Sequence, residues 1–273
     1  MLCPQGNKGK FMSSGNRSRI RCAVLQGAGV AALALCASQA YAVCTFGGSG
    51  EPSLQGSLNS LLGSGVVDAS TSCVNDGSDA AWATAGTTGS ASILIELAGN
   101  ASSNTFGVYD LNNPSNHLSI FEGNDTVDSF AVVRLAPLAN GTWNLSVRER
   151  NNPDDPSGWT QITVASPAFG FYLGTASQGT FFSNTSLNTD GLDHMYAYEG
   201  ANTTFQGGPL AGEVFALQDY ILAWEDLRVP GSDRDYQDFV AVVQDIAPVP
   251  LPTAIWLLAS GLIGLTGVAR RRA

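Results

Sequence analysis

The chain has 273 residues, of which 44% are hydrophobic, and this is enough for one ordinary domain with an apolar core. Its formal net charge is −10, yet both lysines lie within the first ten residues and all 23 acidic residues lie from Glu51 to Asp245. This acidic stretch excludes nucleic acid as a partner, because nucleic-acid binding depends on Lys and Arg that neutralise phosphates. It favours divalent cations instead.

Residues 1–42 have the order of a secretory signal peptide. A basic start is followed by an apolar run over 22–37 and by Ala40-Tyr41-Ala42, whose small residues suit a signal peptidase. We therefore expect export, with cleavage after Ala42 and a short N-terminal segment over 43–53. A membrane anchor is the alternative, although the apolar run is short for one.

Two cysteines, Cys44 and Cys73, remain once the predicted signal peptide is removed. In an oxidising compartment a single pair most simply forms one disulfide, which would tie the start of the mature chain to the start of the domain. A zinc site is disfavoured, since two cysteines without nearby histidines do not fill a tetrahedral shell.

The segment 54–245 has the sequence pattern of one β domain. A short helix is predicted first, with Ser53 as N-cap and Gly63 as stop, because four leucines between them share one helical face. Short apolar or alternating runs then recur between turn residues, which is typical of many short strands. The expected strands are 92–98, 105–109, 118–121, 129–135, 143–148, 160–164, 168–173, 195–199, 213–224 and 238–244. The small-residue stretch 83–92 is expected to be a loop. The predicted fold class is all-β, a single sandwich or jelly-roll-like domain with this helix in front.

One dense group of carboxylates lies near the end of this domain. Its members are Glu225, Asp226, Asp233, Asp235 and Asp238. Calcium takes six to eight oxygen ligands, and closely spaced carboxylates can turn several inward, so we predict a calcium site at these five residues. The spacing is not that of an EF-hand, because the glycine at the sixth loop position and the closing glutamate are missing. The alternative is a solvated acidic turn in which Arg228 and Arg234 neutralise some of the charge.

These residues also carry a family resemblance. Residues 221–227 with 233–240 resemble the closing motif of the DUF4114 family: an apolar strand, E-D-L, a glycine turn, D-R-D-Y-N-D and another apolar strand. Residues 95–99 and 104–110 look like its E-L-A-G and N-x-F-G-I-Y-D opening, and 169–173 look like its middle strand. Gln237 replaces the usual asparagine, which weakens a ligand role there. The resemblance implies a secreted β domain without an assigned catalytic activity.

The segment 249–273 has the pattern of a sorting tail. Val249-Pro250-Leu251-Pro252 precedes an apolar run over 253–269, and the basic end consists of Arg270, Arg271 and Arg272. This pattern resembles a PEP-CTERM signal of the V-P-L-P-A type, with Thr253 in place of alanine. The resemblance implies transient membrane insertion and processing by an exosortase-type membrane protease in a Gram-negative bacterium that makes exopolysaccharide. A permanent anchor is the alternative, since the run is near the lower limit for a membrane span and the arginines would hold its end in the cytoplasm.

The usual catalytic patterns are missing from the sequence, so we expect a protein that is not an enzyme. His117 and His194 do not form an H-E-x-x-H motif, and there is no G-x-S-x-G. We predict a non-catalytic protein of the cell surface or the exopolysaccharide matrix of a biofilm, with extracellular polysaccharide as a partner. The alternative is a carbohydrate-binding module, and core packing competes with sugar stacking for each of its aromatic rings. These rings are Trp82, Trp143, Trp159, Tyr196 and Tyr198.

Overall fold

The computed structural model describes residues 43–46, 53–74, 76–86, 88–96, 101–123, 125–127, 129–149 and 158–249. The predicted signal peptide and the predicted sorting tail beyond Val249 lie outside these residues. No helix in the described part of the chain combines the length and the apolar character that a membrane crossing requires.

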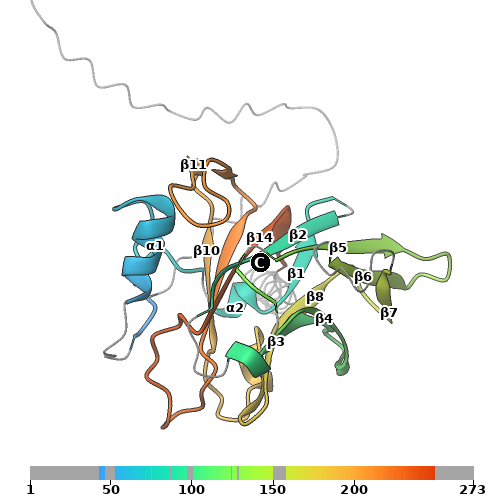
Figure 1. The fold of residues 1–273 in the computed structure, drawn as a ribbon. Helices are drawn as coiled ribbons and strands as arrows, with labels where there is room; N and C mark the ends of the chain where they lie inside the picture. Colours follow the sequence, from blue (N-terminus) through green and yellow to red (C-terminus); the bar gives the residue numbers. More distant parts are fainter. Residues whose placement is uncertain are drawn as a thin grey trace, which may run out of the picture. The chain divides into compact units, whose positions relative to one another are not determined.

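β-Strands are the dominant regular structure of the described chain and helices are few and short, which confirms the predicted mostly β fold (Figure 1). One six-stranded sheet has the order β15-β1-β8-β3-β4, with β9 also paired to β8, and a seven-stranded sheet has the order β10-β13-β14-β2-β5-β6-β7. All pairings between strands in these sheets are antiparallel. The strands of the six-stranded sheet are β1 (Trp82–Thr84), β3 (Thr105–Asp110), β4 (Asn113–Glu122), β8 (Phe169–Thr175), β9 (Gly179–Phe182) and β15 (Ile246–Pro248). Those of the seven-stranded sheet are β2 (Thr88–Glu96), β5 (Phe130–Pro137), β6 (Trp143–Glu149), β7 (Thr160–Val164), β10 (Met195–Glu199), β13 (Tyr220–Trp224) and β14 (Phe239–Gln244). The pair β11 (Thr203–Thr204) and β12 (Val214–Phe215) forms a separate ribbon.

An aromatic core joins the two large sheets. Phe106 of β3 stacks on Phe171 of β8 in its own sheet, with ring centroids 5.5 Å apart. The same ring meets Trp224 and Phe239 of the seven-stranded sheet at 6.1 and 5.0 Å. Side chains of both sheets therefore share one buried apolar cluster, which is the main driving force for this fold.

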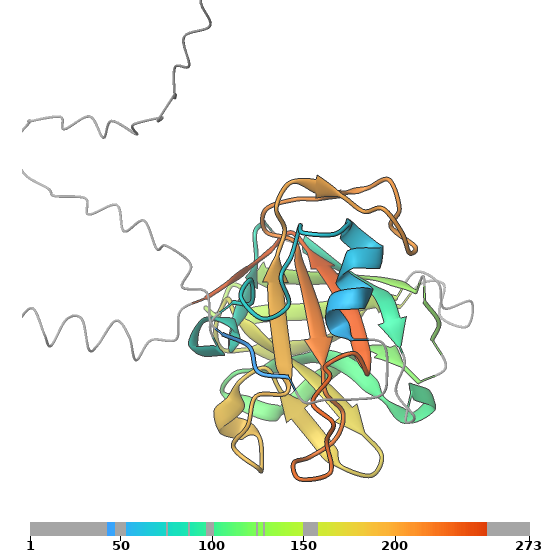
Figure 2. The same ribbon diagram turned by 90° about the vertical axis from the view of Figure 1, so that its left-hand side faces the viewer.

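Helix α1 (Leu54–Leu62) covers the other face of the seven-stranded sheet. Figure 2 shows it, in blue, lying over the orange and red strands β10, β13 and β14. The Ser53 hydroxyl accepts a hydrogen bond from the backbone N–H of Gly56, and Gly63 ends the helix with a φ of 92°. All four leucines of this helix are buried, so the prediction of a short, leucine-faced helix is confirmed.

The remaining helical elements are short: α2 (Asp76–Asp79), η1 (Ala101–Ser103) and η2 (Thr185–Leu187). Beside α1, Cys44 and Cys73 are joined by a disulfide across 29 positions of sequence. Cys73 is fully buried and Cys44 is nearly so. The bond therefore fastens the first described residues onto the cluster beneath α1.

Two strand expectations are corrected by the structure. Residues 83–92 are not a loop, because they form most of β1 and the first half of β2, and β2 pairs with β14 on one side and β5 on the other. Small residues have low strand propensity alone, and here the pairing with two neighbours decides. Residues 213–224 are two strands rather than one, since Gln218 adopts a φ of 70° between β12 and β13.

Candidate metal centre

The predicted cation ligands lie in the carboxylate loop, residues 225–238, which connects β13 to β14. In the antiparallel ladder Trp224 is opposite Phe239, so the residues that follow β13 and precede β14 begin side by side. The backbone N–H of Asp226 donates to Asp238 Oδ2 at 2.9 Å. The ladder thus brings Glu225, Asp226 and Asp238 together, although twelve positions separate the last two.

The rest of the loop returns the chain toward Glu225. A turn closes where the N–H of Gly231 donates to the carbonyl of Arg228 at 2.8 Å. Arg234 and Tyr236 then have φ angles of 58° and 57°, which non-glycine residues rarely adopt. Asp235 stands between them and is 6% exposed, so this unusual backbone accompanies a carboxylate that faces inward.

The structure brings all five predicted carboxylates into two groups that share Glu225. One group is Glu225, Asp226 and Asp238, and the other is Glu225, Asp233 and Asp235. In each group one ligand oxygen per residue lies within 4.8 Å of the others. This span is about twice the 2.3–2.6 Å length of a calcium–oxygen bond, so each triad has the size to enclose one cation.

Burial disfavours the charged form of Glu225, Asp233 and Asp238. Glu225 and Asp226 are each 1% exposed. Burial, reinforced by the nearby Asp233 carboxylate, raises the pKa of Glu225 to about 7. Burial also raises the pKa of Asp238 to about 8, with further contributions from Asp226 and Glu225, and it raises the pKa of Asp233. These carboxyl groups hold protons in the absence of a cation far more readily than free carboxyl groups do.

The arginines of the loop do not neutralise it. Among the described residues, Arg228 and Arg234 form no ion pair with the five carboxylates. The Arg228 guanidinium instead lies against Gly179 at the start of β9. The alternative of an acidic turn neutralised by its own arginines therefore has no support in these contacts.

Two buried amides border the carboxylates, and each has a side-chain oxygen without a hydrogen-bond partner. Asn104, just before β3, donates from Nδ2 to Asp226 Oδ2 at 2.9 Å, while its Oδ1 has no partner. Gln237 donates from Nε2 to Asp235 Oδ2, also at 2.9 Å, while its Oε1 has none. Asn104 is 3% exposed and Gln237 is 1% exposed, so neither oxygen is compensated by bulk solvent.

The backbone of Glu225 is fixed by its neighbour His194, which precedes β10. The N–H of Glu225 donates to the carbonyl of His194 at 3.0 Å, and His194 Nδ1 lies 3.1 Å from the carbonyl oxygen of Glu225. His194 Nε2 lies 3.0 Å from Asp190 Oδ2, and the ring stacks on Phe181 with centroids 3.9 Å apart. Both ring nitrogens of His194 therefore lie within hydrogen-bond distance of a partner.

A cavity of about 180 Å³ opens beside Glu225. Its lining includes Glu225, Ser232 and Arg234 from the carboxylate loop, with Tyr196 and His194 from the β10 side. Of the five carboxylates, Glu225 is the one that lines this cavity.

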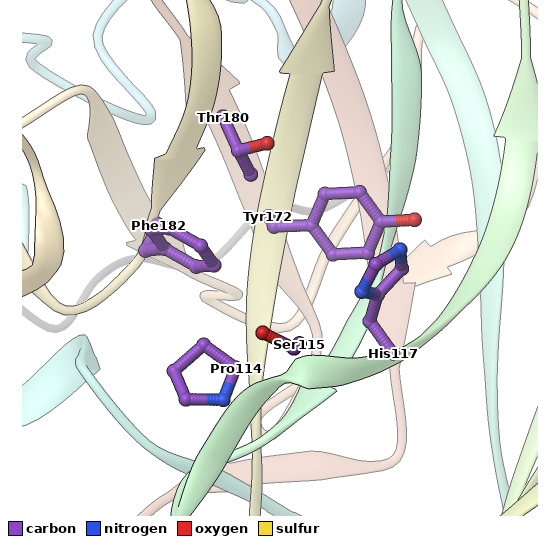
Figure 3. Close-up of a pocket in the computed structure, with 6 residues that line it drawn as sticks. All are labelled: Pro114, Ser115, His117, Tyr172, Thr180 and Phe182. Atoms are coloured by element: carbon purple, nitrogen blue, oxygen red, sulfur yellow. The ribbon is translucent and has the colours of Figure 1, made fainter.

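A second cavity, of about 200 Å³, lies between β4, β8 and β9 (Figure 3). The rings of Tyr172 and His117 meet edge to face in it, with centroids 5.1 Å apart, and Phe182 and Pro114 also line it. Sites for drug-sized molecules usually enclose about 300–1,000 Å³, so this hollow is small for an oligosaccharide.

The aromatic residues considered for sugar stacking are mostly part of the cores. Trp82 and Tyr198 are fully buried and Tyr196 is 8% exposed, whereas Trp143 is partly buried and Trp159 is 38% exposed. Buried rings present no face to a sugar, so the structure leaves no row of stacking platforms among these five.

Sequence reasoning predicted the five carboxylates but missed Asn104 as their neighbour. Asn104 is 122 positions away from Asp226, and no spacing rule connects the two. The one feature of the sequence that could have pointed to Asn104 is its position as the first residue of the N-x-F-G motif. For Gln237 the sequence argued against a ligand role, whereas the structure buries it beside Asp235 with a free side-chain oxygen.

Comparison with known proteins gives one match. The model of a domain of unknown function, DUF4114, matches residues 138–245, a range that contains the whole carboxylate loop. The matched segment depends on strands before it, because β2 pairs with β14 and β3 pairs with β8. No curated protein and no solved structure matches the chain. Residues 138–245 are therefore a DUF4114-like segment of a larger β domain.

Proposed function

We propose that this is an exported, non-catalytic protein of the cell surface or exopolysaccharide matrix, whose β-sandwich domain is stabilised by calcium. The observation that carries the proposal is the convergence of five carboxylates, two of them 1% exposed, without an ion pair from either arginine of their loop. Such a cluster costs free energy unless a cation or protons compensate it.

Calcium suits this donor set better than the alternatives. The carboxylate and amide groups are hard oxygen donors, and calcium accepts more ligands and a more flexible geometry than magnesium does. The triads contain neither histidine nor cysteine, which zinc or copper would favour. Extracellular calcium also exists at concentrations that a site of modest affinity can use.

Export is supported by the signal-like start, by the sorting-like tail and by the Cys44–Cys73 disulfide, because disulfides persist in oxidising compartments. The backbone N–H of Val249 still donates to the carbonyl of Ala81, so the domain extends to the first residue of the proposed sorting motif. Intact-mass analysis of protein from its native host tests the processing. We expect a mass without residues 1–42 and without the tail. A mass that retains the tail would make it a permanent anchor.

Calcium binding is tested by thermal unfolding of the full-length chain in detergent. Chelation with EDTA should lower Tm and added calcium should restore it, because a ligand at a hundred times its Kd stabilises the folded state by about 2.7 kcal/mol. Glu225→Gln should remove this response, and without calcium it should unfold at the same Tm as the wild type or higher, since it removes a buried charge. Glu213→Gln, on an exposed residue outside the loop, is the matched control and should respond like the wild type. An unchanged wild-type Tm across millimolar calcium would refute calcium binding.

A further inference from the structure

We propose that the carboxylate loop binds two cations, with Glu225 as the ligand that they share. This inference rests on the proposed cation binding and adds the number of ions and the division of the ligands. It follows from the grouping of the five carboxylates, which form two triads with one common member.

The first triad has a neutral donor of its own. Asn104 is held beside Asp226 by its Nδ2 hydrogen bond, and its Oδ1 is buried without a partner in the described part of the chain. Side-chain amide oxygens are ordinary calcium ligands. The first position thus has donors in Glu225, Asp226, Asp238 and Asn104, and water completes the shell.

The second triad also has a neutral oxygen donor of its own. Gln237 is held beside Asp235 by its Nε2 hydrogen bond, and its Oε1 is likewise buried with no partner among the described residues. The second position therefore has Glu225, Asp233, Asp235 and Gln237. Because Asp233 is exposed, the water ligands of this ion would come from that side.

Glu225 is suited to join the two positions. Its Oε1 accepts a hydrogen bond from the N–H of Leu227 at 3.2 Å, whereas its buried Oε2 has no hydrogen-bond partner in the described structure. Its backbone is fixed on both sides by His194, as described above, so the carboxylate is held in place before an ion arrives. It is also the one carboxylate of the five that lines the neighbouring cavity.

The charges of the cluster agree with two ions. Five ionised carboxylates around one divalent cation leave a strongly negative, partly buried site, and neither Arg228 nor Arg234 pairs with them. Two divalent cations bring the net charge of the five carboxylates and the bound ions close to zero. Since an uncompensated buried charge is costly, the second ion has a clear electrostatic reason to bind.

Native mass spectrometry of the full-length chain, titrated with calcium chloride, counts the ions directly. We expect two calcium ions on the wild type and on Glu213→Gln. Asp238→Asn and Asp233→Asn should each keep one ion, because each disables one triad, and Glu225→Gln should weaken both by at least tenfold. Isothermal titration calorimetry should give the same numbers.

The outcomes separate this inference from the function on which it rests. A wild type that binds one ion overturns the two-ion arrangement and leaves calcium binding intact, whereas a wild type that binds none overturns both. Loss of both ions from Asp233→Asn would also overturn the division into two triads. The wild-type count needs no variant, and Asp233 is exposed, so a folding defect in Asp238→Asn does not leave the inference untested.

Discussion

Trp224 and Glu225 are adjacent in the chain and almost equally buried, at 0% and 1% exposure. Trp224 nevertheless lies in an apolar environment, whereas Glu225 lies among carboxylates. Trp224 ends β13 in the aromatic core, where its ring packs on Phe106. Glu225 begins the carboxylate loop, where burial raises its pKa. Burial of the apolar ring does not depend on pH or on cations, even though its indole N–H has no hydrogen-bond partner in the described structure. Burial of the carboxylate becomes favourable only when protons or cations compensate its charge. Equal burial therefore does not mean equal contribution to stability.

The largest expected effect tests the aromatic side of this comparison. Phe106→Ala removes a ring that contacts Phe171 in its own sheet and Trp224 and Phe239 in the other. We expect a loss of about 3–5 kcal/mol in the free energy of unfolding, since large-to-small substitutions in a core also leave a cavity. Urea unfolding measures it, and Phe106→Leu should lose much less.

The same measurement in EDTA and in saturating calcium shows whether the two regions are independent. The loss caused by Phe106→Ala should be equal in both solutions, because the rings that Phe106 contacts belong to the apolar core. A loss that differs by more than about 0.5 kcal/mol between the solutions would contradict this independence and indicate coupling between core and loop.

The sequence allows much of the aromatic side to be predicted. Leucine spacing between Ser53 and Gly63 predicts α1, because helix periodicity and capping are local properties. Alternating runs predict most of the strands for the same reason. The loop prediction for 83–92 is wrong, because the small residues at the start of β2 are held in a strand by pairing with β14 and β5. Such pairing joins distant parts of the chain and cannot be inferred from local sequence.

The candidate metal centre is predictable only in part. The close spacing of the five carboxylates in the sequence indicates that they converge, and the structure does bring all five together. Asn104 could not be placed beside them, because its approach depends on how β3 and β13 are arranged in two different sheets. The sequence also could not show that Arg228 and Arg234 form no ion pair with the carboxylates. The direction of a side chain in a loop with positive φ angles does not follow from the spacing of residues in the sequence.

The carboxylate side of the comparison is tested by pH. In the folded state without a cation, the pKa of Glu225 is about 7 and that of Asp238 is about 8, above the ordinary values of 4.5 and 3.8. The folded state therefore binds more protons than the unfolded state between these limits, and stability falls as pH rises through the window. We expect the protein in EDTA to lose several kcal/mol of stability between pH 5 and pH 9, because both raised pKa values lie in this window and one pKa unit corresponds to about 1.4 kcal/mol.

In saturating calcium, stability should instead rise with pH at the acidic end of the range from pH 5 to pH 9. A bound cation requires ionised carboxylates, so calcium binds more weakly at pH 5 than at pH 8, and its stabilisation grows as protons leave. Urea unfolding at several pH values, with calcium and with EDTA, measures both slopes. Phe106→Ala provides the control, because it should lower both curves without changing their shape. A stability in EDTA that rises steadily from pH 5 to pH 9 would show that the buried carboxylates are compensated within the protein, and the contrast between Trp224 and Glu225 would then disappear.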